Sequence, residues 1–83
     1  LSEMKLFPNP TSNTVTINLF SKDQGAATLT ITNLMGQVVY NEIVSLGYGT
    51  NQLMVNCSDF ISGFYLVNIS TQKGSTTQKL IVQ

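Results

Sequence analysis

The stretch "TVTINL", Thr14 to Leu19, alternates polar and apolar side chains at every step. Because successive side chains of a β-strand point to opposite faces, this alternation predicts a strand that buries Val15, Ile17 and Leu19. The segment "ATLTIT", Ala27 to Thr32, repeats the pattern, with threonine on the polar side, where a pleated surface favours it. Both segments therefore predict half-buried strands that face a common core.

The same period of two continues along the chain, and no segment shows the 3.6-residue period of a helix. Further strands are expected at Met4 to Phe7, Gln37 to Ile43, Asn51 to Val55, Phe64 to Ser70 and Gln78 to Val82. Short strands at a spacing of about 8–12 residues are typical of a sandwich. The sequence thus predicts an all-β fold, an immunoglobulin-like antiparallel β-sandwich of about seven strands, with residues 1–83 as a single domain.

Two interruptions of the alternation predict a turn and a bulge. Asn33 to Gly36 has the composition of a hairpin turn, in which a glycine accepts positive φ without a steric penalty. Val38 and Val39 are adjacent, so one of them must leave the inward register. We expect a bulge at this pair, with Val39 pointing inward.

The composition excludes several classes of function. Charged residues make up 10% of the chain and the formal net charge is +0, so the clustered Lys and Arg of a nucleic-acid binder are missing. The chain has no histidine and one cysteine, Cys57, which leaves no internal disulfide and no Cys-His or Ser-His nucleophile pair. No apolar stretch approaches the ~20 residues of a membrane helix. We expect a non-enzymatic module without cofactor, metal, nucleic-acid partner or membrane-spanning segment.

The sequence "FPNPTSN", Phe7 to Asn13, places two prolines around one asparagine, just before the first clear strand. Proline fixes its own φ, has no N–H, and biases the preceding residue toward extended conformations. Because neither proline can donate a ladder hydrogen bond, the first strand must end here or lie at an edge. The stretch predicts a stiff corner between the first two strands.

Four short motifs occur in a fixed order along the chain. They are Phe7-Pro8-Asn9-Pro10 with Asn13, Gly36-Gln37, Ser58 with Phe60, Gly63 and Tyr65, and Lys79-Leu80-Ile81-Val82-Gln83. In this order the chain closely resembles, over essentially its whole length, the type A C-terminal sorting domain of cargo proteins of the Bacteroidota type IX secretion system. It departs from the usual family pattern at Phe7, Phe60 and Cys57, where tyrosine, leucine and often an acidic residue are found.

The resemblance implies a function without chemistry. Such domains end a larger protein that crosses the inner membrane by a separate signal, folds in the periplasm and then passes through the outer-membrane translocon. In many members a surface sortase removes the domain; other members are released. The implied partners are the translocon, an outer-membrane shuttle protein, the sortase and a cargo domain attached before Leu1. The implied destination is the surface or the medium of a Gram-negative bacterium.

The resemblance also implies which residues a partner recognises. These residues are Pro8, Asn9, Pro10, Gly63, Tyr65, Lys79, Leu80, Ile81, Val82 and Gln83. An apolar run on an exposed edge suits a receptor that pairs with the strand. A structural interpretation stays open beside it, in which Leu80 and Val82 complete the core and Ile81 packs under a loop.

Two other functions remain open at this point. A carbohydrate-binding or adhesive sandwich would use exposed aromatic side chains, for which Tyr48 and Phe64 are the candidates in a chain without tryptophan. A structural spacer of a secreted multidomain protein would tolerate change at the terminal run. Each predicts a different behaviour for a protein fused to this domain.

Overall fold

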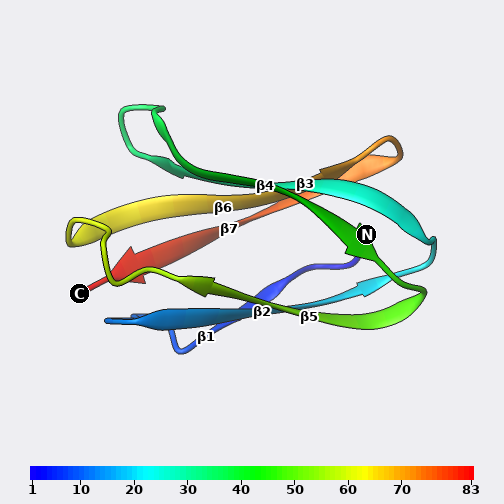
Figure 1. The fold of residues 1–83 in the computed structure, drawn as a ribbon, viewed down its shortest axis with the longest axis horizontal. Helices are drawn as coiled ribbons and strands as arrows, with labels where there is room; N and C mark the ends of the chain where they lie inside the picture. Colours follow the sequence, from blue (N-terminus) through cyan, green and yellow to red (C-terminus); the bar gives the residue numbers. More distant parts are fainter.

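The computed structural model describes residues 1–83 as seven β-strands without a helix (Figure 1). The strands are β1 (Lys5–Phe7), β2 (Thr14–Ser21), β3 (Gly25–Asn33), β4 (Val38–Leu46), β5 (Gly49–Asn56), β6 (Gly63–Thr71) and β7 (Gly74–Val82). One sheet has the strand order β1-β2-β5 and the other β4-β3-β6-β7, with antiparallel pairing throughout both. The predicted all-β antiparallel sandwich is confirmed, and its immunoglobulin-like character stays a prediction.

One hydrophobic core lies between the two sheets. Alternate residues of the strands face it, as the period of two predicts. The buried core residues are Met4, Val15, Ile17, Leu19, Ala27, Leu29, Ile31, Leu46, Val55, Cys57, Tyr65, Val67, Ile69, Leu80 and Val82. Full burial of an aliphatic side chain contributes about 1.5–3 kcal/mol. The stretch Thr14 to Leu19 thus supplies three core residues in six positions.

The pairing of β4 with β3 confirms the predicted bulge but not the predicted inward residue. Tyr40 lies opposite Ile31, whereas the next residue of β3, Thr32, lies opposite Val38, so the predicted bulge is present. Val39, however, is 41% exposed, and the expectation that it points inward is wrong. The extra residue of a bulge is left out of the ladder. Tyr40 instead occupies the inward position and packs against the core.

The turn between β3 and β4 forms as the sequence predicts. Gly36 has φ +84, a conformation that suits glycine because it has no Cβ. The Asn33 Oδ1 atom accepts hydrogen bonds from the N–H groups of Met35 and Gln37 at 2.9 and 3.0 Å. These bonds close the hairpin and leave Leu34 and Met35 exposed at its tip.

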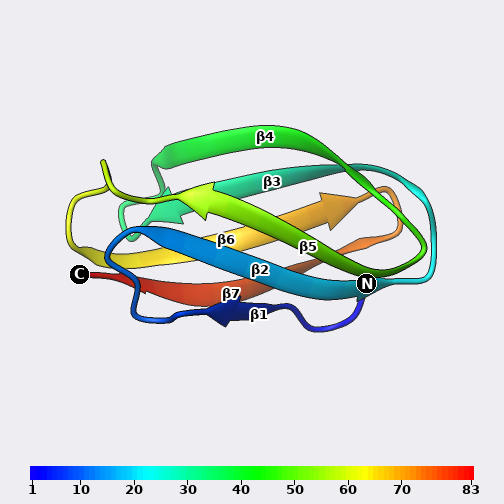
Figure 2. The ribbon, with the colours of Figure 1, turned by 60° about the horizontal axis from the view of Figure 1, so that its bottom comes forward.

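The sandwich is 34 Å long, and its two ends differ. The β3–β4 turn, the β5–β6 connection, the corner at residues 8–13 and the C-terminus gather at one end, on the left in Figures 1 and 2. The N-terminus and the other three turns lie toward the opposite end. We call the end that contains the C-terminus and residues 8–13 the C-terminal end. No helix of the length and apolarity needed to cross a membrane is present.

Candidate functional site

The four sequence motifs converge on the C-terminal end of the sandwich. Tyr65 lies opposite Asn33 on one side and Leu80 on the other, which brings the β3–β4 turn, the start of β6 and the end of β7 together. Thr11, one residue after the second proline, forms a parallel bridge with Val82. Motifs far apart in the sequence are therefore neighbours in the fold.

Asn9 and Thr11 bind the outer edge of β7, the last strand of its sheet. Asn9 Nδ2 donates a hydrogen bond to the Lys79 carbonyl, and the Ile81 N–H donates one to Asn9 Oδ1, both at 2.9 Å. The Thr11 N–H donates to the Ile81 carbonyl at 2.9 Å, and the Gln83 N–H donates to the Thr11 carbonyl at 2.8 Å. We call residues Asn9–Thr11 the clasp, because they close this part of the strand edge.

The carboxamide of Asn9 acts as a substitute peptide group. In a parallel ladder one residue donates its N–H to one carbonyl of the neighbouring strand and accepts from the N–H two residues further on. Thr11 makes this pair of bonds with its main chain, whereas Asn9 makes the preceding pair with its side chain. An asparagine side chain offers both a donor and an acceptor, whereas an ionised aspartate offers acceptors alone. The clasp thus requires an amide at this position.

The prolines flank the residue whose side chain bonds to β7. Pro8 and Pro10 have no N–H, so Asn9 is the one residue of the three that carries a main-chain donor. The Phe7–Pro8 and Asn9–Pro10 peptide bonds are both cis. The strand β1 ends at Phe7, as predicted from the first proline. The corner therefore does more than connect two strands, because it delivers an amide to β7.

Gly63 and Tyr65 support the same end of the molecule from within. Tyr65 is 6% exposed, its ring packs against Phe60 with 5.4 Å between centroids, and its hydroxyl donates to the Ile61 carbonyl. A tyrosine near the start of a strand that bonds to upstream backbone is typical of corners in β-sandwiches. Gly63 has φ +153, which residues with a side chain rarely adopt. Both residues fix the β5–β6 connection, and the Tyr65 ring is covered in the folded domain.

The run from Lys79 to Gln83 divides between two faces of the sheet. Leu80 and Val82 are buried in the core at 0% and 3% exposure, as the structural interpretation predicts. Lys79 and Ile81 point to the outer face, where Ile81 is partly buried. Since β6 pairs with one edge of this run and the clasp with the other, its backbone is not a free edge in the folded domain.

An exposed surface remains on the outer face of β6 and β7. Phe64 lies opposite Ile81 and is 45% exposed. Lys79 Nζ lies 4.6 Å from the centroid of the Phe64 ring, within the range of a cation–π interaction. Leu66, opposite Lys79, continues this surface. A positive charge therefore sits beside apolar groups next to the clasped strand.

Cys57 joins the β5–β6 connection to the corner. Its N–H donates to the Asn13 carbonyl at 2.7 Å, and its side chain is 1% exposed. Burial raises the pKa of the thiol, and a backbone hydrogen bond involving Val15 opposes this. A buried thiol with a raised pKa carries little thiolate, the reactive form. The residue thus packs as a small apolar group.

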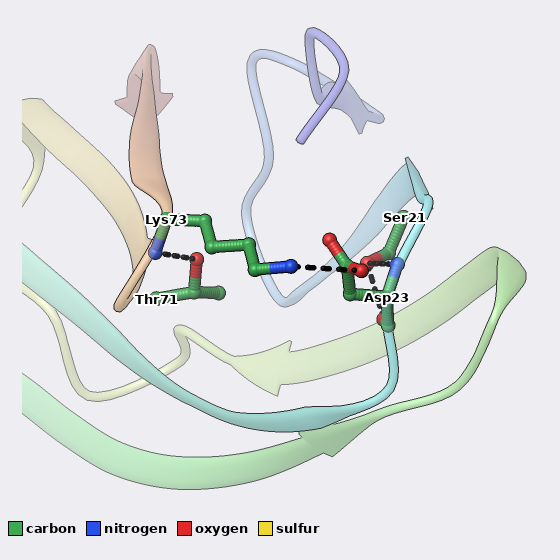
Figure 3. A network of polar contacts seen from close by, with 4 residues as sticks. All are labelled: Ser21, Asp23, Thr71 and Lys73. Atoms are coloured by element: carbon green, nitrogen blue, oxygen red, sulfur yellow. Dashed lines mark hydrogen bonds and ion pairs between the residues drawn. The ribbon is translucent and has the colours of Figure 1, made fainter.

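The opposite end carries a polar network, shown in Figure 3. Lys73 Nζ lies 3.2 Å from Asp23 Oδ1, and the Ser21 Oγ atom donates to the Asp23 carbonyl at 2.7 Å. Both partners of the ion pair are more than half exposed, and such pairs contribute about 0–1 kcal/mol. A shallow pocket of about 260 Å³ lies beside them and includes Leu1 and Leu46 in its lining. The network joins two turns and contains no histidine or cysteine that would indicate chemistry.

The two aromatic candidates for sugar binding do not share a face. Tyr48 lies in the β4–β5 turn, is 71% exposed and contacts Phe20 edge to face with 6.2 Å between centroids. Phe64 lies at the start of β6, at the C-terminal end. A sugar platform needs aromatic rings side by side, and this pair lies at the two ends of the sandwich. No cluster of three His, Cys, Asp or Glu side chains is present.

The fold and site define a small β-sandwich module whose C-terminal strand is held by a proline-flanked amide. Residues 5–83 match the family model described as the secretion system C-terminal sorting domain. The match covers nearly the whole chain, which therefore belongs to this family of type IX secretion sorting domains. This confirms the resemblance found in the sequence motifs. No curated protein matches the sequence.

Proposed function

We propose that this domain directs an attached cargo protein across the outer membrane through the type IX secretion translocon, and that the clasped end of β7 is the part that the machinery recognises. Family membership supports a sorting signal. The observation that carries the proposal is the pair of hydrogen bonds that the Asn9 side chain makes with Lys79 and Ile81, because they join the two most widely separated motifs into one structural unit.

The placement of the chain ends supports this proposal. A cargo domain joined ahead of Leu1 would emerge toward the end opposite the clasp. Such a cargo leaves the C-terminal end open to a partner. One domain of this kind therefore suits cargoes of different shapes.

The proposed recognition residues fall into two groups with different roles. Lys79 and Ile81 offer side chains on the outer face beside Phe64, where a shuttle protein or the translocon can contact them. Pro8, Asn9, Pro10, Gly63 and Tyr65, together with Leu80 and Val82, act by holding that surface in place. Gln83 is fixed through its N–H. Removal of the domain by a sortase and release of the cargo at the surface or into the medium belong to the same proposal.

A reporter fusion tests this function directly. A fluorescent protein sent to the periplasm and joined ahead of Leu1–Gln83 should reach the surface or the medium of a type IX-competent host, and should stay in the periplasm of a strain without the translocon. A glycan-binding module would instead leave the fusion in the periplasm but retain it on a polysaccharide column. A spacer would do neither. Periplasmic retention of a folded fusion in the competent host contradicts the proposal.

A paired set of variants tests the site. Lys79→Ala with Ile81→Ser changes two outward side chains of β7, and Asn41→Ala with Ile43→Ser makes the matched change on β4, the other edge strand. We expect the first pair to reduce export and the second to leave it unchanged. Thermal unfolding of both proteins provides the control for folding. Normal export of the β7 pair would remove this surface from the proposed site.

A further inference from the structure

The clasp covers only part of the outer edge of β7. The N–H and carbonyl of Ile81 both point away from β6, toward the clasp. Because backbone groups alternate in direction along a strand, those of Ser75 and Thr77 point the same way. Neither residue has a main-chain bond outside the β6–β7 ladder, and β7 has β6 as its single strand neighbour. No main-chain bond thus occupies the outer edge at Ser75–Thr77, and the clasp closes it from Lys79 onward. The strand β1 lies beside β7, and the Gln78 Nε2 atom donates to the Met4 carbonyl at 3.1 Å.

The open part has the properties of an edge that accepts another strand. Ser75 and Thr77 are exposed, and this stretch contains no proline, no charged residue and no bulge. Proteins commonly protect open edges with such features. The flanking charges are Lys73, which pairs with Asp23, and Lys79, whose ammonium group lies over the Phe64 ring.

The clasp shows which geometry this edge accepts. Thr11 pairs with Ile81 and Gln83 in the parallel direction, through a bridge to Val82. The clasp makes four hydrogen bonds, two of them from an exposed side chain. A parallel strand that paired first with Ser75 and Thr77 and then advanced toward Gln83 would replace each bond with another of the same kind. Such an exchange costs little per step.

We propose that the outer edge of β7, from Ser75 to Gln83, is a strand-addition site for an extended segment of a partner protein that runs parallel to β7. The clasp closes the second half of this site until the partner displaces it. Main-chain hydrogen bonds would supply affinity, and alternate side chains would supply specificity. The segment that fits carries apolar side chains on the face that continues Phe64 and Ile81. This inference rests on the proposed function and adds to it the mode of recognition.

The strand β4 provides a matched control edge. It has nine residues like β7, and it too has a single strand neighbour. The backbone N–H and carbonyl groups of Tyr40 and Glu42 point toward β3, where these residues lie opposite Ile31 and Leu29. Because these groups alternate in direction along a strand, those of Asn41 point outward. Thr77 and Asn41 are each the fourth residue of their strand. A proline at either place removes an outward N–H without breaking a ladder bond, and edge strands tolerate such a change. At Thr77 it also removes the hydroxyl that accepts a hydrogen bond from Asn68 Nδ2 at 2.8 Å.

The first experiment compares Thr77→Pro with Asn41→Pro in the reporter fusion, and thermal unfolding shows that both proteins fold. We expect Thr77→Pro to reduce export about tenfold or more, because a partner strand would lose a donor and meet the proline ring, whereas Asn41→Pro leaves export unchanged. Unchanged export of folded Thr77→Pro overturns the inference and leaves the sorting function intact. Equal losses in both variants also overturn it.

The second experiment keeps the open edge and locks the clasp. Thr11→Cys with Val82→Cys, in a Cys57→Ala background, places two thiols at bridge partners, where the oxidising periplasm joins them. We expect the locked fusion to stay in the periplasm, and we expect more of the same double variant to be exported when a reductant keeps its two thiols unpaired. Export of the fully locked protein shows that the clasp need not open, which contradicts its displacement. Retention of the parent fusion would instead refute the sorting function and this inference with it.

Discussion

The two edge strands of the four-stranded sheet have equal length and opposite character. β7 buries Leu80 and Val82, and the clasp closes part of its outer edge. β4 is richer in apolar residues, yet Ile43 points to the outer face and is 76% exposed, and of its inward residues Leu46 alone is fully buried. The opposing sheet has three strands, so it does not offer one strand for each strand of the four-stranded sheet. Burial along an edge strand therefore depends on which face a residue occupies and on what lies opposite that face, and the apolar content of the strand does not determine it.

We expect the largest effect when variants of the two edge strands are compared in the free energy of unfolding of the domain. Leu80→Ala empties a fully buried position of β7 and should cost about 2–5 kcal/mol, whereas Ile43→Ala on β4 should change the free energy by no more than about 0.5 kcal/mol. Urea unfolding followed by tyrosine fluorescence measures both. A domain of this size has about 4–12 kcal/mol in total, so the first variant should lose much of its stability. Similar losses in the two variants would show that the outer face of β4 is also packed.

Variants at the clasp and at the open edge of β4 should differ less in the free energy of unfolding. Asn9→Ala removes two hydrogen bonds from an exposed position and should cost about 1–2 kcal/mol, while Asn41→Ala at the open edge should cost less than about 0.5 kcal/mol. Amide exchange provides a local measurement, since the Ile81 N–H should exchange faster in the first variant. Asn9→Asp should lose the bond to the Lys79 carbonyl but keep an acceptor for the Ile81 N–H, because a carboxylate accepts hydrogen bonds and does not donate them. Full retention of Ile81 protection in Asn9→Ala would mean that the main chain of the clasp suffices.

The smallest effect concerns the pH response of β4. The hydrogen bond to Glu42, assisted by burial, raises the pKa of Tyr40. A raised pKa in the folded state means that this bond stabilises the protein below the ordinary tyrosine pKa and is lost as the pH rises through the raised value. Glu42→Gln should lower the Tyr40 pKa toward its ordinary value, as tyrosinate absorbance would show. Tyr40→Phe identifies which transition belongs to this residue, and an unchanged transition in Glu42→Gln would assign the shift to burial instead.

Strand positions and much of the core are predictable from sequence because they depend on local alternation. Val15, Ile17 and Leu19 are buried as their spacing predicts, and Gly36 takes the positive φ that its turn requires. Local alternation does not predict which residue at the bulge points inward. The two adjacent valines are equivalent in pattern, and the structure places Tyr40 inward instead.

The clasp is not predictable from local pattern, although both of its partners stand out in the sequence. Asn9 and Lys79 are 70 residues apart, and no periodicity links them. The sequence showed an asparagine between prolines and an apolar terminal run, and family resemblance marked both for recognition. That one supplies hydrogen bonds to the other depends on how the corner between β1 and β2 crosses to the opposite sheet. A search for amide side chains that flank proline and face an edge strand would have found the pair.

The second proline also protects the amide chemically. Asparagine normally deamidates when the backbone nitrogen of the next residue attacks the side-chain carbonyl and closes a succinimide ring. The nitrogen of Pro10 is fully substituted and has no hydrogen to lose, so this ring cannot form at Asn9. The other asparagines of the chain all precede residues with an ordinary N–H. The one carboxamide that completes the β7 edge is thus also the one that does not age to aspartate by this route, however long the folded domain waits before export.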